Sequence, residues 1–280
     1  MSEASLEKAA RLLELLRSMR SVMVCFSGGV DSALLLAAAH RALGDGAVGL
    51  TAVSASLPPG EREETARVAA AIGARHVFVD THEIDDPKYA KNAPDRCFHC
   101  KTELYNVAAA HKDRLGVEVV TSGIITDDFG DYRPGIDAAR EHAVRFPLAE
   151  AGFTKADVRA VAAAWDLPIW NKPASACLSS RIPYGTEVTR ERLARIGGLE
   201  GELHAMGLRQ VRVRYHELQD GAPLARIEAS ASDEELLFAN RREIGRAARQ
   251  HGFRHATMDL LGYRTGSQNE LLHGRVLKIV

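Results

Sequence analysis

The chain has 280 residues, of which 46% are hydrophobic and 26% are charged, the composition of an ordinary globular protein. Its basic and acidic residues nearly balance, giving a formal net charge of −1. This balance disfavours a nucleic-acid binder that relies on a positive field over its whole surface. The length allows one large domain, or a main domain with a smaller one.

The N-terminal segment, residues 1–21, predicts an amphipathic helix. Glu3, Glu7 and Glu14 lie among its apolar positions, so we do not expect a secretory signal. No apolar run reaches membrane-spanning length, and we expect a cytoplasmic protein without membrane contact. The four cysteines include a Cys97-Phe-His-Cys100 spacing, which fits metal or redox chemistry in a reducing compartment better than a disulfide scaffold.

Residues 22–43 predict a strand, a turn and a helix. The apolar run 22–26 is typical of a buried parallel strand, with Cys25 in the core, and Ala33–Leu43 consists almost entirely of alanine and leucine. Between them lies the turn Ser-Gly-Gly-Val-Asp-Ser, residues 27–32. Free N–H groups at the start of a helix favour an anion such as phosphate. A serine-rich turn that only caps a core helix is the alternative.

This turn resembles the SGGxDS pattern of the PP-loop ATP pyrophosphatases. It is not a Walker A loop, because no lysine follows the glycines. The resemblance implies that five residues of the turn hold ATP phosphates: Ser27, Gly28, Gly29, Asp31 and Ser32. It also implies that Asp31 lies beside Mg²⁺, a hard cation that prefers oxygen ligands. In these enzymes the α-phosphate of ATP is attacked and AMP is left on a substrate oxygen.

Apolar and helical segments continue to alternate along the first half of the chain. We expect strands at Ala47–Val53, His76–Val79 and Val117–Thr121, and a helix at Glu61–Ile72. The fold class is therefore α/β, with a parallel sheet covered on both faces. Such sheets bind ligands at the carboxyl ends of their strands, where the 27–32 turn lies.

The pattern changes near residue 172. We expect a PP-loop ATP-binding domain over residues 1–171 and a smaller α+β domain, for substrate binding and sulfur transfer, over 172–280. Residues 209–216 and 224–230 alternate as half-buried strands do, and one helix is predicted over Asp233–His251.

The segment KPASACLSSRIPYG, residues 172–185, places Cys177 among small residues, shortly before an arginine. A nearby arginine favours the thiolate, which is both a nucleophile and a metal ligand. A lone cysteine is also commonly a small buried hydrophobic residue, so the segment alone leaves both interpretations open.

Seven motifs of the chain resemble, in order and spacing, those of the LarE family of ATP-dependent sulfur transferases. They are SGGVDS, NAPDRCFHCK, TDDFGDYRPG, KPASACLSSRIPYG, VRVRYH, ARIE and MDLLGYRTGS. The resemblance covers nearly the whole chain. It implies an enzyme that adenylates a carboxylate of pyridinium-3,5-biscarboxylic acid mononucleotide with release of pyrophosphate. The carboxylate then becomes a thiocarboxylate, on the route to the nickel-pincer nucleotide cofactor.

The resemblance assigns roles in the second half of the chain. Cys177 corresponds to the sulfur-bearing cysteine, with Glu200 an acid near it. Substrate binding is implied for four residues: Ser180, Arg181, Arg212 and Arg214. Because Arg212 and Arg214 are two apart on a predicted strand, they share one face and could bind the substrate phosphate. The outward face of an exposed strand would give the same pattern.

Polar residues also follow the strand predicted at 117–121. They are Asp127, Asp128, Asp131, Tyr132 and Arg133. Their place at the ligand edge of the sheet predicts contact with ATP or Mg²⁺, and an acidic surface turn is the alternative. Ile124 and Ile125 depart from the family pattern, which usually has polar residues there.

Cys97 and Cys100 leave two mechanisms open. In one, Cys177 alone gives up its sulfur and becomes dehydroalanine. In the other, which we favour because all three thiols are present, Cys97, Cys100 and Cys177 hold a [4Fe-4S] cluster that carries an extra sulfide. The pair is expected in a polar loop, and a zinc site recruiting His99 or a pair of reduced thiols are its alternatives.

Two rival functions remain at this stage. One is thiolation of another carboxylated or nucleoside substrate, including a tRNA base, which the near-neutral charge disfavours. The other is a noncatalytic carrier of a nucleotide or cluster. The resemblance further implies a homo-oligomer, since relatives form hexamers.

Overall fold

The computed structural model describes residues 2–130, 133–173 and 175–264. The chain divides into two compact units, which are described separately. Unit 1 comprises residues up to Ser54, Glu61–Tyr89 and Pro94–Ser175. Unit 2 comprises Ala55–Gly60, Ala90–Ala93 and the residues from Ala176 onward. Two short segments of the first hundred residues therefore belong with the second half of the chain.

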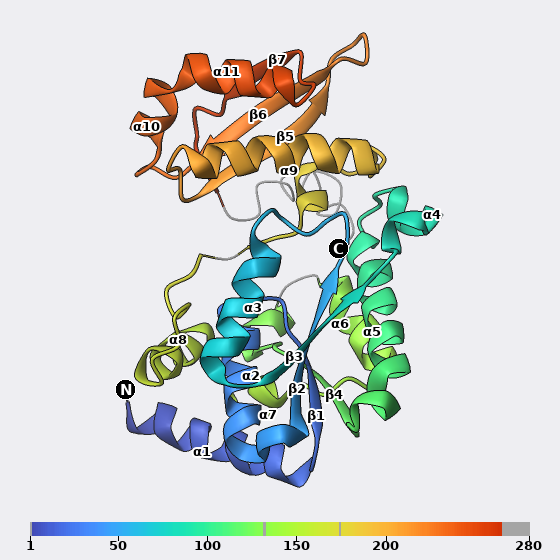
Figure 1. The fold of residues 1–280 in the computed structure, drawn as a ribbon, viewed down its shortest axis with the longest axis vertical. Coiled ribbons are helices and arrows are strands. Elements are labelled where there is room, and N and C mark those ends of the chain that lie inside the picture. Colours follow the sequence, from blue (N-terminus) through green and yellow to red (C-terminus); the bar gives the residue numbers. More distant parts are fainter. Residues whose placement is uncertain (1, 131–132, 174, 265–280) are drawn as a thin grey trace, which may run out of the picture. The chain divides into compact units, whose positions relative to one another are not determined.

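Unit 1 is built on a parallel sheet, as predicted. Its four described strands lie in the order β3-β2-β1-β4 (Figure 1). Their bounds are β1 Val22–Cys25, β2 Ala47–Val53, β3 Arg75–Asp80 and β4 Val119–Ser122. In the register of the sheet, Cys25 pairs with Leu50 on one side and with Ser122 on the other. The segments that follow β1 and β4 therefore begin at the same edge.

Helices cover both faces of this sheet (Figure 1). One face carries α1 Glu3–Ser18, α2 Val30–Leu43, α3 Glu61–Ile72 and α8 Lys155–Ala164, and the other carries α5 Arg96–Leu115 and α6 Pro134–Glu141. Val22 and Val24 of β1 join the first apolar cluster, whereas Met23 and Cys25 join the second. Alternate residues of a strand point to opposite faces, so a strand covered on both sides needs an uninterrupted apolar run.

Shorter helical elements connect these parts. They are η1 Gly44–Gly46, η2 Glu83–Asp85, α4 Pro87–Ala90, η3 Thr126–Gly130 and α7 Pro147–Glu150.

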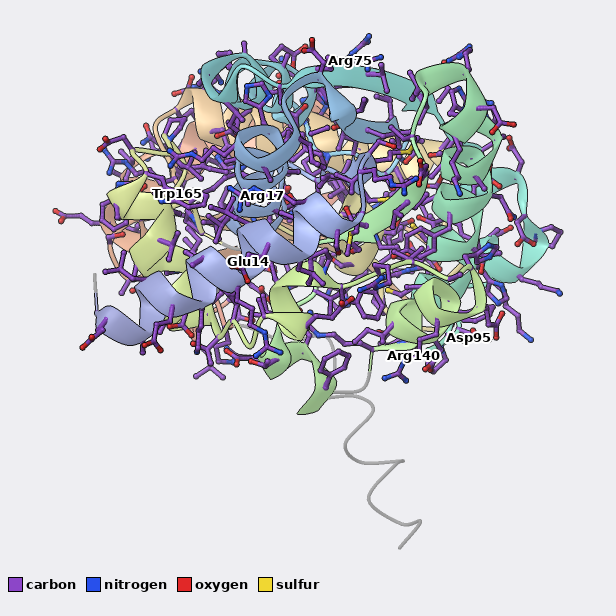
Figure 2. All side chains as sticks on the ribbon, turned by 90° about the horizontal axis from the view of Figure 1, so that it is seen from below. Glu14, Arg17, Arg75, Asp95, Arg140 and Trp165 are labelled. Carbon is purple, nitrogen blue, oxygen red and sulfur yellow. The ribbon has the colours of Figure 1, made fainter. Side chains whose placement is uncertain are left out.

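The N-terminal helix α1 is amphipathic, as predicted. Leu12 and Leu16 are fully buried, whereas Glu14 and Arg17, marked in Figure 2, are exposed. Ser2 caps the helix by accepting a hydrogen bond from the backbone N–H of Ser5. Within the described ranges, no helix is long and apolar enough to cross a membrane.

Unit 2 contains a smaller mixed sheet in the order β5-β6-β7. Strands β5 Val211–Glu217 and β6 Pro223–Ala229 are antiparallel, and β7 His255–Met258 runs parallel to β6. Helix α9 Arg190–Ala205 packs on β5, and the short η4 Leu178–Arg181 contacts both of them. The strands predicted at 209–216 and 224–230 are confirmed, but β7 was not predicted, because three of its four residues are exposed and give no alternation.

The single helix predicted over Asp233–His251 is wrong. The structure has two helices, α10 Glu234–Ala239 and α11 Arg241–Gln250, separated by Asn240. The side-chain amide of Asn240 donates to the carbonyl of Leu236 at 2.9 Å. Asparagine competes for backbone hydrogen bonds in this way, which explains the break.

Candidate active site

The turn at residues 27–32 joins β1 to α2 at the carboxyl edge of the parallel sheet. The hydroxyl oxygens of Ser27 and Ser32 lie 3.2 Å apart, and Ser32 donates to the carbonyl of Gly29 at 3.0 Å. These hydroxyls therefore support the turn itself. Gly29 stands at the N-cap of α2, and in the described part of the chain no side chain caps it. The N–H groups of the first helical turn thus remain open to an anion.

Two glycines let other segments pack closely around this turn. Gly28 has φ +73°, and a Cβ added there would lie 2.5 Å from Cγ2 of Thr65 on α3. A Cβ on Gly123, just after β4, would lie 2.9 Å from the backbone nitrogen of Ser32. Any larger side chain at either position would displace the turn. Gly28 belongs to the predicted phosphate-binding turn, whereas Gly123 was not predicted, because its only signal in the sequence is a glycine directly after a strand.

The Asp31 carboxylate pairs with a lysine that lies 124 residues later in the chain. The ammonium of Lys155 lies 2.7 Å from each carboxylate oxygen of Asp31. The backbone N–H of Lys155, at the start of α8, donates to Asp127 at 3.0 Å. The structure thus brings Asp31 and Asp127, both predicted site residues, to the first residue of the same helix.

The residues around Asp31 fit a magnesium ion. Mg²⁺ is usually bound through one or two carboxylates together with substrate phosphates. Asp31 offers such a carboxylate beside the turn, and the Lys155 ammonium shows that a cation is accommodated there. Asp31 would hold the ion, which would neutralise charge on the ATP phosphates.

Asp128 is engaged in its own turn. One carboxylate oxygen accepts from the N–H of Ile125 at 3.0 Å, and the other lies 2.6 Å from Arg133. Ile125 is buried in the apolar core of unit 1, which explains why this position is not polar. Contact between Asp128 and ATP stays a prediction. Asp131 and Tyr132 lie outside the described residues.

Lys172 also reaches the turn, although no role was predicted for it from the sequence. Its ammonium lies 2.8 Å from Glu61, 2.7 Å from Glu64 and 3.3 Å from the carbonyl oxygen of Gly28. The two glutamates are three residues apart on α3 and so share one face. The spacing of the two glutamates and the lysine before Pro173 were visible in the sequence. Nothing in the neighbouring sequence indicated that this lysine and these glutamates would be in contact.

The cysteine pair lies in a helix, so the prediction of a polar loop is wrong. Cys97 and Cys100 lie in the first two turns of α5, which begins at Arg96. Cys97 is exposed and Cys100 is partly exposed. Burial lowers the pKa of Lys101, but the neighbouring Tyr105 and the cysteines outweigh it and raise that pKa above its usual value. A cation therefore stands beside the pair.

The metal prediction at these cysteines receives no support from the geometry. Over residues 2–130, 133–173 and 175–264, no three His, Cys, Asp or Glu side chains are grouped so that they could hold a metal ion. His99, the suggested zinc ligand, lies 3.5 Å from Asp95 instead. Burial raises the pKa of the Cys25 thiol to about 12, so Cys25 is an inert core residue, as predicted.

Cys177, in unit 2, precedes η4 and is partly exposed. Its carbonyl oxygen accepts hydrogen bonds from Arg181 Nη1 and from the hydroxyl of Ser180, both at 2.8 Å. The next residue, Leu178, donates its N–H to the carbonyl of Ser56 at 2.8 Å. The backbone on both sides of Cys177 is therefore fixed, while the residue remains partly exposed.

Arg181 is paired with Glu200 inside unit 2. Two guanidinium nitrogens lie 3.0 and 3.1 Å from the two carboxylate oxygens, and the side chains are only 1% and 2% exposed. Glu200 also accepts from the N–H of Val213 at 2.9 Å. A bidentate pair at such depth holds one geometry, because either charge left alone would be strongly destabilising.

Arg212 and Arg214 lie on β5 and are buried, so the alternative of an exposed strand face is wrong. Arg214 donates to the carbonyl of Ser180 at 2.9 Å and to Glu228 at 2.8 Å. Burial, followed by repulsion from Arg181, lowers the pKa of Arg212, which remains a cation at any physiological pH.

Glu228 was not among the predicted site residues. It pairs with Arg212 in the register of β5 and β6 and is fully buried. Its presence in the alternating ARIE segment was a weak signal, because a strand of that pattern can expose its acidic residue.

This buried cluster is rich in arginine. Three buried guanidinium groups, those of Arg181, Arg212 and Arg214, meet two buried carboxylates, those of Glu200 and Glu228. Arginine guanidinium groups bind phosphate well. An anionic group of a ligand would therefore be favoured here.

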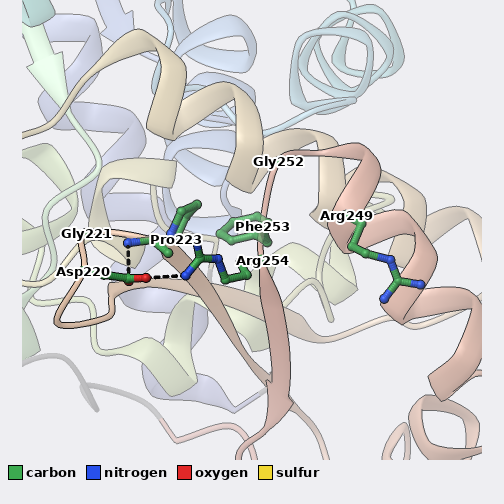
Figure 3. A pocket seen from close by; sticks show the side chains of 8 residues that line it. Asp220, Gly221, Pro223, Arg249, Gly252, Phe253 and Arg254 are labelled. Atoms are coloured by element: carbon green, nitrogen blue, oxygen red, sulfur yellow. Dashed lines mark hydrogen bonds and ion pairs between the residues drawn. The ribbon is translucent and has the colours of Figure 1, made fainter.

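A hollow of about 580 Å³ in unit 2 contains none of the predicted site residues. It lies between the β5–β6 turn and the end of α11, where Asp220 and Arg254 face each other and Arg249 stands apart (Figure 3). We assign it no part in the site.

The parallel sheet with its SGGVDS turn defines an ATP-using enzyme of the PP-loop class, and residues 3–121 match the asparagine synthase family. The chain is 36% identical over 266 residues, 95% of each chain, to the pyridinium-3,5-bisthiocarboxylic acid mononucleotide synthase of Lactiplantibacillus plantarum. It is 40% identical over 267 residues to an uncharacterized protein of Synechocystis, covering 95% of this chain and 98% of that one. The chain belongs to the LarE family.

Proposed function

We propose that the chain is an ATP-dependent sulfur transferase acting on pyridinium-3,5-biscarboxylic acid mononucleotide. It adenylates a carboxylate of this substrate and converts it to a thiocarboxylate for the nickel-pincer nucleotide cofactor. The proposal is supported above all by similarity over 95% of the chain to a relative named for the bisthiocarboxylated mononucleotide. The partly exposed Cys177, whose backbone carbonyl is held by Arg181, supports it further.

Adenylation is the task of unit 1. A substrate carboxylate oxygen attacks the α-phosphate of ATP, and pyrophosphate leaves. The open N–H groups at the start of α2 bind the phosphates. Lys155 and Lys172 supply the positive charge that the turn itself lacks, by moving from their carboxylate partners to the phosphates.

Substrate binding and sulfur transfer are tasks of unit 2. Arg212 and Arg214 bind the phosphate of the mononucleotide, which the grouping of their buried guanidinium groups with that of Arg181 supports. The Cys177 thiolate attacks the acyl-adenylate and AMP leaves, forming a thioester. Arg212→Ala and Arg214→Ala should each raise the KM for the mononucleotide more than the KM for ATP.

The thioester then gives up its sulfur. A base removes the Cα proton of Cys177, and the Cβ–S bond breaks. The products are the thiocarboxylate and dehydroalanine at position 177, so each chain reacts once by this route.

The cluster predicted from the sequence remains a second candidate for the sulfur source. Cys97 and Cys100 are three residues apart on α5, so their side chains share one helix face. The described residues provide no three-ligand group, and we derive no step through a cluster. Iron and sulfide analysis of anaerobically purified protein checks this candidate, and loss of iron in each of the three Cys→Ala variants would support it.

The decisive experiment uses Cys177→Ala. We expect this variant to release pyrophosphate with ATP and the mononucleotide but to form no thiocarboxylate, because activation precedes sulfur transfer. In the parent chain, intact-mass analysis after one turnover should show a loss of about 34 Da, the mass of H₂S lost when a cysteine becomes dehydroalanine. Thiocarboxylate formation by Cys177→Ala would refute the role of this residue.

Light scattering would test the predicted homo-oligomer.

A further inference from the structure

The carbonyl oxygen of Cys177 accepts three hydrogen bonds. The backbone N–H of Ser180 donates at 3.0 Å, the Ser180 hydroxyl at 2.8 Å and Arg181 Nη1 at 2.8 Å. The first is the ordinary bond of a short 3₁₀ turn. The other two come from side chains that the turn does not require. Donors are thus concentrated on the carbonyl of the residue proposed to give up its sulfur.

The arginine donor is charged, buried and fixed. Its guanidinium binds both oxygens of Glu200, and its Nη1 also donates to the carbonyl of Ala176 at 2.5 Å. Arg181 is 2% exposed, so little water competes for these bonds. In such surroundings a fixed cation interacts strongly with negative charge that develops on the oxygen it already touches.

The elimination step places negative charge on this oxygen. When a base takes the Cα proton of Cys177, the electron pair of the C–H bond moves into the adjacent carbonyl as an enolate. It then forms the Cα–Cβ double bond while the Cβ–S bond breaks, and the sulfur leaves with its electron pair. An amide Cα–H is a weak acid, so the enolate is the difficult species and its oxygen is where stabilisation is most effective.

We propose that Arg181 and Ser180 form an oxyanion hole for the carbonyl of Cys177 itself, which makes the Cα proton of that cysteine removable. The inference rests on the proposed function only in taking Cys177 as the sulfur donor. It gives Arg181 and Ser180 a role in β-elimination that is separate from binding substrate.

The experiment requires neither ATP nor mononucleotide. A dibromo diamide reagent alkylates a cysteine twice, giving a cyclic sulfonium that becomes dehydroalanine by loss of the Cα proton. After excess reagent is removed, peptide mass spectrometry follows the decay of the sulfonium at each site. Cys97, also accessible and in the same chain, is the internal comparison.

We expect the sulfonium at Cys177 to eliminate about tenfold or more faster than that at Cys97, since single oxyanion donors have effects of this order or larger. In concentrated urea the two rates should become equal. Equal rates in the folded protein would overturn the proposal.

Two substitutions locate the effect. Ser180→Ala should slow elimination at Cys177 several-fold and leave Cys97 unchanged, whereas Ser180→Thr, which keeps the hydroxyl, should restore the rate. Arg181→Lys keeps the positive charge but loses the planar guanidinium with its several N–H donors. It should slow elimination at Cys177 further. If Arg181→Lys does not fold, the two Ser180 variants still test the oxyanion hole. An unchanged elimination rate in Ser180→Ala would contradict the role of the hydroxyl.

The outcome is separable from that of the proposed function. Thiocarboxylate formation is measured in its own assay with ATP and the mononucleotide. A chain that eliminates rapidly at Cys177 but forms no thiocarboxylate would refute the function and leave the oxyanion hole intact. The reverse result would refute only the oxyanion hole.

Discussion

Unit 1 and unit 2 each hold a lysine or arginine against a carboxylate, but at different depths. The Lys155–Asp31 pair is 39% and 28% exposed, whereas the Arg181–Glu200 pair is 1% and 2% exposed. Pairs that touch water are weak and can change partners. A buried pair cannot separate without leaving a charge uncompensated. Depth alone therefore makes one pair suited to exchange with a ligand and the other suited to hold a geometry.

This difference matches the two tasks proposed for the units. ATP arrives with several negative charges and leaves as pyrophosphate and AMP, so cations that can move between carboxylates and phosphates are useful in unit 1. The thiol of unit 2 is part of the chain, and its backbone must be oriented before any ligand arrives. Arg181 achieves this through contacts with Ala176, Cys177 and Ser180.

The largest expected effect is on the stability of unit 2. Arg181→Met leaves Glu200 buried without its partner and should lower the free energy of unfolding by about 3–5 kcal/mol. Lys155→Met, in the exposed pair, should change it by less than about 1 kcal/mol. Urea unfolding of the two variants measures both. The double variant Arg181→Met/Glu200→Leu should recover most of the loss, and equal losses in the two single variants would remove the distinction between the pairs.

The second largest effect is on adenylation. Asp31→Asn should reduce pyrophosphate release by about 10²-fold, the order found when a group that stabilises developing charge is removed. Its stability should change little, because Asp31 is partly exposed. Asp128→Asn is the matched comparison, since Asp128 supports its own turn through Ile125 and should lose stability instead of activity. A large activity loss in Asp128→Asn with unchanged stability would place that residue at ATP.

Most of unit 1 was predictable because its signals are local. Five consecutive apolar residues before Ser27 identify a strand covered on both faces, and the alanines and leucines after Ser32 identify its helix. The break at Asn240 was not, because it depends on a side-chain hydrogen bond that competes with an otherwise adequate helical pattern. The helical start at Arg96 was not predicted either, and within the described residues the Asp95 side chain at its N-cap makes no capping hydrogen bond.

The charged partners of the site were the least predictable part. Lys155 reaches Asp31 across 124 residues of sequence, and Lys172 reaches Gly28 across 144. A motif defines the turn but not the side chains that the fold brings to it. Glu228 was not predicted for the same reason. Its place in the site follows from its pairing with Arg212 of β5, which the sequence does not show.

A smaller effect, on nucleotide affinity, should distinguish Lys155 and Lys172, which contact the turn, from a lysine or arginine in a purely structural ion pair. Lys155→Met and Lys172→Met should each weaken binding of α,β-methylene-ATP about tenfold, the order of a charge-assisted contact. Binding of AMP, which lacks the β- and γ-phosphates, should change much less. Calorimetry measures both ligands. Arg145→Met is the control, because Arg145 pairs with Glu150 elsewhere in the same unit. Equal weakening of both nucleotides would deny these lysines a phosphate role.

The smallest effect concerns pH and the helix that carries Lys155. Burial raises the pKa of Asp157, but hydrogen bonds from Lys8, Thr154 and Ser5 outweigh this effect. They hold that pKa well below its usual value. Because the folded-state pKa is depressed, the stabilisation is complete above the unfolded pKa of about 3.9 and is lost as the pH falls below it. Asp157 also completes the capping box of α8 with Thr154, so Asp157→Asn should cost about 1 kcal/mol at pH 7.

The stability difference between the parent chain and Asp157→Asn should therefore shrink as the pH is lowered through 4, and urea unfolding at a series of pH values measures it. Lys8→Met removes the ion pair but keeps the cap, so it should cost less than Asp157→Asn at pH 7. A difference between parent and Asp157→Asn that is constant from pH 7 to pH 3 would show that the carboxylate's charge contributes nothing. The start of α8, and with it Lys155, would then depend on neutral hydrogen bonds alone.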